Sequence, residues 1–117
     1  MVPGPCALVT ALAGSGLATN AFYFGGFLPN KSGAREKKLK ELAERQETLI
    51  FYESPYRIVK TLEAIAKIYG ERRVILAREL TKKFEEFLRG TPQELLTHFK
   101  SRSPKGEFVV LIQGAQQ

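Results

Sequence analysis

The chain has 117 residues and a mass of 13.1 kDa, the size of one globular domain. Hydrophobic residues at 44% and charged residues at 26% exclude a disordered or low-complexity chain. Eighteen Lys and Arg residues against twelve Asp and Glu give a net charge of +6, which favours a polyanion such as RNA as partner, with solubility alone as the alternative explanation.

Cysteine and histidine are nearly absent, which limits the possible chemistry. A single cysteine, Cys6, excludes an internal disulfide and fits a reducing, cytoplasmic setting. One histidine, His98, leaves no Cys/His cluster for a metal site, so no metal is expected. No apolar run approaches the roughly 18 residues that a membrane span needs, so no membrane association is expected either.

The first third of the chain predicts a helix, a strand and a second helix. Small apolar residues from Cys6 to Leu12 are typical of a short buried helix. The aromatic, glycine-containing segment from Phe22 to Leu28 stops at a Pro-Asn pair, which indicates a strand running into a loop. From Ser32 to about Gln46, apolar residues recur at the i, i+3, i+4, i+7 spacing and predict an amphipathic surface helix.

The middle of the chain predicts a buried strand followed by a well-defined helix. Thr48 to Tyr52 is a short continuous apolar run, which suits a strand inside a partly parallel sheet. Ser54 can cap the next helix with Pro55 in its first turn. A buried stripe then continues to Tyr69, and Gly70 ends the helix.

The last third completes an α/β alternation. Val74 to Ala77 and Glu86 to Leu88 predict strands, and Phe108 to Ile112 predicts the last one. Between them, the segment from Thr91 to Glu94 is a capping box with proline at the first helical position. The fold class is therefore α/β, with a mixed sheet of about five strands flanked by helices.

Two features that could suggest catalysis are better explained by structure. The segment Gly14 to Thr19 half resembles a dinucleotide-binding loop, but its third glycine is missing and it follows a helix, which favours a helix stop. His98 lies on a predicted surface helix without the partners of a catalytic triad, which favours a solvated side chain.

Positive charge is concentrated on the second predicted helix and on the loop before it. Pairs such as Glu36 with Lys40 are in register for ordinary i, i+4 salt bridges, which is the simpler explanation. A net positive charge remains after such pairing and could lie along a phosphate backbone. The candidate RNA contacts are Lys31, Arg35, Lys37, Lys38 and Arg57.

Glu53 ends a predicted strand just before a helix start, where the helix dipole favours a carboxylate. Arg57, one turn later, and Arg78, at the end of another strand, are its candidate partners. One interpretation is an ion pair that fixes the strand ends, and the other is a role in a ligand cleft, since open α/β sheets bind ligands at their carboxyl ends.

Five strings taken together make the chain similar to one protein family. The chain resembles the C-terminal half of the small-subunit rRNA methyltransferases of the tetrapyrrole methylase superfamily. The resemblance runs in order along nearly the whole chain, and the alternation of elements begins with a loop and a helix, as a domain cut from mid-protein would. The strings are VPGPCALVTALAGSGL, FYFGGFLP, LIFYESPYR, VILARELTKKFEE and KGEFVVLIQG.

The resemblance implies a function for the domain. In that family two α/β domains enclose S-adenosylmethionine, and the enzyme methylates a cytidine ribose 2′-hydroxyl of small-subunit rRNA. Residues 1–117 would form a single C-terminal domain, inactive without the missing N-terminal domain, and a homodimer is expected. By the family pattern, the cofactor-binding residues would be Pro3, Gly4, Pro5, Cys6, Ala7, Phe51, Tyr52, Ala77, Arg78, Gln113 and Gly114.

The catalytic base stays open at this level. Transfer of a methyl group to an alcohol oxygen needs alignment and an acceptor for the hydroxyl proton. Glu53 is the candidate carboxylate, although the ion-pair interpretation competes with this role. Two alternative functions also stay open: a basic RNA-binding or dimerisation module without cofactor binding, and a relative that acts on a small tetrapyrrole.

Overall fold

The computed structural model describes residues 22–80, 83–104 and 106–115, and within them the side chains outside 79–86. The helix expected over Cys6 to Leu12 lies outside these ranges. The described elements, in chain order, are β1 (Phe22–Phe27), α2 (Ser32–Leu42), β2 (Thr48–Glu53), α3 (Ile58–Tyr69), β3 (Val74–Leu80), β4 (Lys83–Gly90), α4 (Pro92–Ser101) and β5 (Glu107–Ile112).

The five strands form one mixed sheet in the order β1-β2-β5-β3-β4. Strand β1 pairs parallel with β2, whereas β5 pairs antiparallel with both β2 and β3, and β4 pairs antiparallel with β3. Strands β1, β2 and β3 therefore run in the same direction and end at the same edge of the sheet. This architecture confirms the predicted mixed sheet of five strands.

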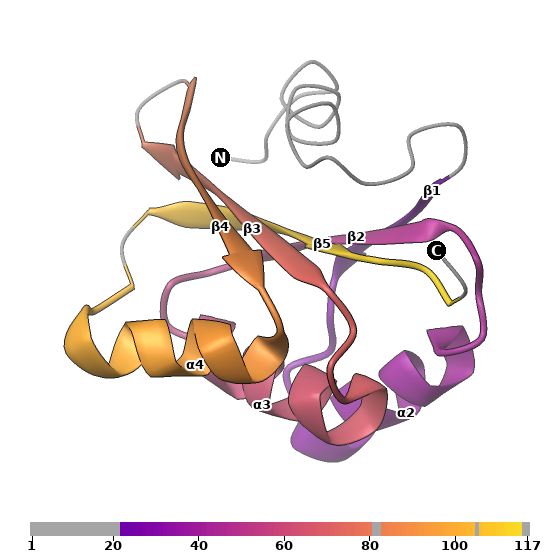
Figure 1. Cartoon of the computed structure of the whole chain (residues 1–117). Helices are drawn as coiled ribbons and strands as arrows, with labels where there is room; N and C mark the ends of the chain where they lie inside the picture. Colours follow the sequence, from indigo (N-terminus) through magenta and orange to yellow (C-terminus); the bar gives the residue numbers. More distant parts are fainter. Residues whose placement is uncertain (1–21, 81–82, 105, 116–117) are drawn as a thin grey trace.

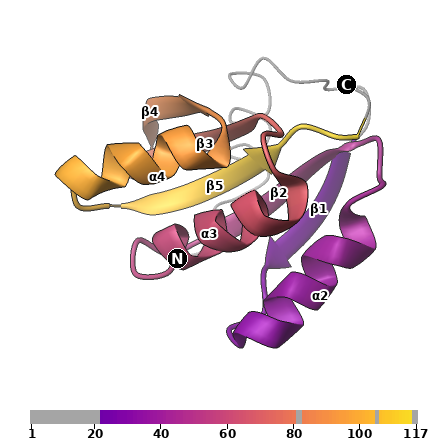
Figure 2. The ribbon, with the colours of Figure 1, turned by 60° about the horizontal axis from the view of Figure 1, so that its bottom comes forward.

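The three described helices cover the same face of the sheet (Figure 1). Seen from that side, α4, α3 and α2 lie next to one another, with α4 over the β3–β4 end of the sheet and α2 beside β1 (Figure 2). None of the helices in the described ranges is long and apolar enough to cross a membrane.

Each face of the sheet carries its own buried cluster. The face that packs on the helices joins alternate strand residues to the apolar stripes of α2, α3 and α4, as the two-residue period of a strand requires. We call the opposite side the helix-free face, because no described helix covers it. The buried residues of the helix-free face are Ile50, Tyr52, Ile75, Ala77, Val109 and Leu111.

Two helix ends match their sequence signals closely. Gly70 ends α3 with a φ of +65°, and its N–H donates to the carbonyl of Ala66 at 3.1 Å. At the start of α4, the Thr91 hydroxyl accepts from the N–H of Glu94, while the Glu94 carboxylate accepts from the N–H of Thr91. Both predictions are confirmed, and both rest on purely local chemistry.

Four element boundaries differ from the prediction by three or more residues, one of them the end of β3, which runs to Leu80 instead of Ala77. Helix α2 ends at Leu42, although the apolar spacing continues to Gln46. Helix α3 begins at Ile58, because the Ser54 carbonyl accepts from the N–H groups of Arg57 and Ile58 and holds the intervening residues in a turn. Strand β4 begins at Lys83, since its pairing with β3 extends through a mostly charged stretch that has no apolar pattern of its own.

A glycine pair reshapes strand β1. The register between β1 and β2 shifts between Phe24 and Gly26, so one extra residue bulges out of the ladder. Gly26 has a φ of +68°, and a Cβ on Gly25 would overlap the ring of Phe51, so both positions require glycine. The bulge places Phe27 on the same face as Phe24, whereas a regular strand would put residues three apart on opposite faces.

Candidate functional site at the carboxyl edge of the sheet

Four of the predicted site residues meet where the parallel strands end. Across the sheet, Glu53 and Arg78 are both paired with Phe108 of β5. One residue earlier, Tyr52 and Ala77 are both paired with Val109. We call this end of the sheet, where β1, β2 and β3 finish at Phe27, Glu53 and Leu80, the carboxyl edge; it is where open α/β sheets place ligands.

The two faces of the sheet divide these residues. Tyr52 and Ala77 belong to the helix-free face, at 7% and 0% exposure. Phe51 points the other way and is buried beneath the helices at 1% exposure. A ligand on the helix-free face would therefore lie on the side of Tyr52 and Ala77, whereas Phe51 is a core residue on the other side.

Gln113 and Gly114 lie at the opposite end of the sheet. The N–H of Gln113 donates to the carbonyl of Arg73 at 2.9 Å, just before β3 begins. A Cβ on Gly114 would overlap the backbone carbonyl of Gln46, so close packing of two backbone segments explains this glycine. Gln113 is four positions after Val109, a span of about 13 Å along a strand.

The predicted cofactor loop of Pro3, Gly4, Pro5, Cys6 and Ala7 lies outside the described residues. Its position relative to the carboxyl edge stays a prediction.

Glu53 is held by three donors at the carboxyl edge. It is 3% exposed and sits at the end of β2, facing α3. Its Oε2 accepts from the Thr61 hydroxyl at 2.6 Å, and its Oε1 accepts from the backbone N–H of Ser54 at 2.9 Å. The same Oε1 lies 3.3 Å from Nε of Arg57. This arrangement matches the ion-pair interpretation, with Arg57 as the partner and the strand end fixed to the helix.

Thr61, for which the sequence analysis made no prediction, completes this network. Thr61 is fully buried on the apolar stripe of α3, three residues after Ile58 and four before Ile65. A polar residue at such a position needs a hydrogen-bond partner, because a buried hydroxyl without one is costly. That requirement is the signal that could have linked Thr61 to a buried acceptor such as Glu53.

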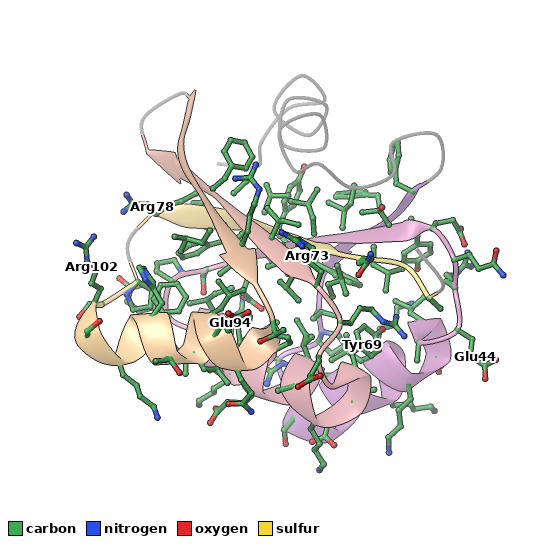
Figure 3. All side chains as sticks on the ribbon, viewed as in Figure 1. Glu44, Tyr69, Arg73, Arg78, Glu94 and Arg102 are labelled. Carbon is green, nitrogen blue, oxygen red and sulfur yellow. The ribbon has the colours of Figure 1, made fainter. Side chains whose placement is uncertain are left out.

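Arg78 lies with Arg102 at one end of the molecule, where both side chains project from the sheet and from the end of α4 (Figure 3). Together with Phe108 and His98 they line a cavity of about 50 Å³. A drug-sized or cofactor-sized ligand needs a pocket of roughly 300 Å³ or more. This cavity is therefore too small to hold a nucleoside cofactor by itself.

The predicted RNA contacts differ widely in exposure. Lys31 and Lys37 are exposed, and the ammonium of Lys38 lies 5.8 Å from the centre of the Tyr23 ring. Arg35 was expected on this basic surface, but it is only 5% exposed and its Nη2 donates to the Asn30 carbonyl at 3.0 Å. Its burial beside the loop makes Arg35 a poor contact for a polyanion.

Salt bridging on α2 also differs from the expected i, i+4 pattern. Glu36 lies 3.0 Å from Lys67 of α3, so this carboxylate links two helices. Among the described residues, no salt bridge pairs Lys31 or Lys37, so their positive charge is available at the surface.

Comparison with known proteins identifies the family. The model of the family described as Tetrapyrrole (Corrin/Porphyrin) Methylases matches residues 1–96. Proteins named ribosomal RNA small subunit methyltransferase I are similar along almost the whole chain. Those of Bacillus subtilis and Vibrio cholerae are 44% and 50% identical over 114 and 117 residues, which is 97% of this chain in each case.

The chain spans about two-fifths of the length of these relatives, 39% for Bacillus subtilis and 40% for Vibrio cholerae. Solved structures agree on the fold. The methyltransferase CobJ superposes with a TM-score of 0.66 at 20% identity, over 93% of this chain and 48% of CobJ. The cobalt precorrin-4 methyltransferase CbiF gives 0.61 at 14% identity, over 92% and 47%. With its family model covering most of the sequence, the chain belongs to the tetrapyrrole methylase family.

Proposed function

We propose that this chain is the C-terminal domain of an S-adenosylmethionine-dependent enzyme that methylates the ribose 2′-hydroxyl of a cytidine in small-subunit rRNA. The observation that supports it most is the identity of 44% to 50%, along 97% of the chain, to proteins named for rRNA methylation. The net charge of +6 suits a polyanionic substrate such as RNA better than a small uncharged one. The single cysteine fits a cytoplasmic enzyme.

In this proposal the described residues contribute one wall of the cofactor site. Tyr52 and Ala77 lie on the helix-free face near the carboxyl edge, and their aromatic and small apolar side chains match an adenosyl group in chemical character. At 7% and 0% exposure both are covered in this structure, so their neighbours must move for an adenosyl group to contact them. The cavity at Arg78, a predicted cofactor residue of this edge, has a volume of only about 50 Å³. These residues do not enclose S-adenosylmethionine, and the remaining walls would come from elsewhere in the protein.

When bound, the cofactor supplies a methyl group on a sulfonium, and the acceptor oxygen must be aligned with it and lose its proton. Glu53 is poorly placed to take this proton, since three donors already contact its two oxygens. We assign Glu53 to fixing the end of β2, which keeps Tyr52 in position. The proton acceptor would then belong to another part of the enzyme or to water.

A methyl-transfer assay with labelled S-adenosylmethionine and small-subunit RNA tests the proposal. The 117-residue chain should give no transfer, and the full-length protein should label the RNA in a residue that alkaline hydrolysis identifies as 2′-O-methylated. Methyl transfer by the 117-residue chain alone would contradict the proposal that this domain needs the rest of the enzyme for activity. A full-length protein that labels a tetrapyrrole instead of RNA would disprove the substrate class.

A second candidate is an RNA-binding or dimerisation module that has no cofactor affinity of its own. The exposed cations Lys31 and Lys37 favour it. Binding through lysine contacts to phosphates should weaken steeply with salt, whereas association through an apolar face should not. Sedimentation at several salt concentrations, with and without RNA, separates RNA binding from the homodimer that the family leads us to expect.

A further inference from the structure

Three phenylalanines of β1 remain exposed along the edge of the sheet. Phe22, Phe24 and Phe27 are 43%, 44% and 51% exposed. The rings of Phe24 and Phe27 meet Tyr52 edge to face, at centroid distances of 5.1 and 5.7 Å. The bulge at the glycine pair creates this arrangement, because without it Phe27 would turn toward the helices.

A fourth aromatic ring lies just beyond the end of β2. Tyr56 is 92% exposed, in the turn between β2 and α3. Four contacts stabilise this turn. The Ser54 carbonyl accepts from the N–H groups of Arg57 and Ile58, and the Glu53 carboxylate binds the N–H of Ser54 and the side chain of Arg57. The Glu53 carboxylate thus holds the turn that carries Tyr56 in place at the carboxyl edge. Phe27 ends β1 at this same edge.

Exposed aromatic rings held by a strand and by a stabilised turn indicate a ligand with flat apolar faces. Aromatic rings exposed to water lose the favourable free energy of burial. A group of exposed rings is therefore typical of an interaction site. Two cations follow these rings closely in the chain: Lys31 is exposed in the loop after β1, and the side chain of Arg57, the residue after Tyr56, is 32% exposed. Aromatic rings beside cations are the chemistry that recognises single-stranded RNA, in which bases stack on rings and phosphates contact Lys and Arg.

We propose that Phe24, Phe27 and Tyr56 form a stacking surface for unpaired nucleotides of RNA, with Lys31 and Arg57 as phosphate contacts. This inference rests on the proposed function and deepens it by naming where the RNA lies and in which form. A double helix keeps its bases stacked on one another and offers no free base to these rings. The surface should therefore select unpaired RNA over a duplex of the same sequence.

Fluorescence anisotropy with a labelled 12-nucleotide RNA, single-stranded or annealed to its complement, tests the proposal on the 117-residue chain. Tyr56→Ala and Phe27→Ala should each weaken single-strand binding by roughly 5- to 150-fold, the usual effect of losing one base–aromatic stack. Tyr56→Phe keeps the ring and should bind as the parent chain does. Val59→Ala, at a 37% exposed apolar residue of α3, is the matched control and should also leave binding unchanged.

Salt dependence separates stacking from charge. Lys31→Ala should reduce the slope of log affinity against log salt by about 0.7, whereas Tyr56→Ala should shift affinity without changing this slope. Urea midpoints of all variants verify that they fold, and Phe27 and Tyr56 are exposed enough for their replacement to be tolerated.

Two results would overturn the proposal. The first is unchanged single-strand affinity in both Tyr56→Ala and Phe27→Ala, or equal affinity for the duplex. The second is conversion of a dimer into monomers by Phe24→Ala and Phe27→Ala with RNA binding intact, which would assign the surface to a second copy. If the surface binds unpaired RNA while the full-length protein fails to methylate RNA, the proposed function is wrong and this inference stands.

Discussion

Glu53 combines a full charge with almost complete burial, and such a group is stable only when its oxygens are satisfied. Glu53→Gln keeps the shape but turns an amide N–H₂ toward existing donors, so we expect a loss of about 1–3 kcal/mol in the free energy of unfolding. Thr61→Val should cost a similar amount, because it removes the 2.6 Å hydrogen bond, whereas Thr61→Ser should cost less. Urea denaturation of the three variants measures these differences.

The same variants distinguish a positioning role from a catalytic one. A Glu53→Gln variant with an unchanged urea midpoint, but without methyl transfer in the full-length protein, would show that the carboxylate takes part in the reaction itself. Loss of stability shared by Glu53→Gln and Thr61→Val supports the structural network instead.

Tyr69 makes stability sensitive to alkaline pH. Its hydroxyl donates to the carbonyl of Leu39 at 2.7 Å, and burial raises its pKa from 10.0 to about 12, partly opposed by the neighbouring charge of Arg72. Between pH 10 and 12 the unfolded chain loses a proton that the folded chain keeps, so stability falls as pH rises through this window and is fully present below it.

Tyr69→Phe tests this linkage. At pH 7 the variant should lose about 1 kcal/mol with the hydrogen bond. From pH 10 to 12 the parent chain should lose stability relative to the variant, as measured by urea midpoints at a series of pH values. Parallel pH profiles of the two proteins would show that this tyrosine does not contribute to alkaline unfolding.

At the scale of elements, the bulge in β1 depends on Gly26 for its positive φ and on Gly25 for the space beside Phe51. Gly25→Ala forces a methyl group into the ring of Phe51, and we expect a loss of about 1–3 kcal/mol from such overpacking. Gly33→Ala is the matched control: it lies in the first turn of α2, nothing is within 4 Å of its added Cβ, and alanine favours the helix. Thermal unfolding of both should show opposite shifts, and a stable Gly25→Ala would mean that β1 can adopt a regular register.

Local signals predicted the elements well where one residue decides the structure. Gly70 and the Thr91–Glu94 capping box are examples, since each acts within a single turn. The start of α3 was missed by three residues because Ser54 and Pro55 form a turn as readily as a first helical turn. The first part of β4 was missed because its pairing with β3, and not its own sequence, makes Lys83 to Glu85 a strand.

At the scale of the whole molecule, the strand order decides which predicted site residues meet. Strand β5 comes last in the chain but inserts between β2 and β3, so Phe108 separates Glu53 from Arg78. No local pattern encodes this insertion, and sequence reasoning therefore grouped residues from both ends of the sheet into one site. The strands themselves were predicted correctly from the sequence. Only the strand pairing shows that Gln113 lies far from the carboxyl edge.

This geometry makes a prediction for the cofactor. If S-adenosylhomocysteine is titrated into the labelled chain, backbone amide shifts should be largest at Tyr52 and Ala77, which share a row of the sheet. Gln113 and Gly114, about 13 Å further along the strands, should move less, because the hydrogen bond to Arg73 and close packing already account for them. Ala115, whose N–H is bonded to the Arg45 carbonyl, serves as an internal reference at that end. Shifts confined to Gly114 and its neighbours would place the cofactor at the end of the sheet opposite the carboxyl edge and would contradict our proposal. A spectrum of a folded protein that shows no shifts would assign the cofactor affinity to the rest of the enzyme.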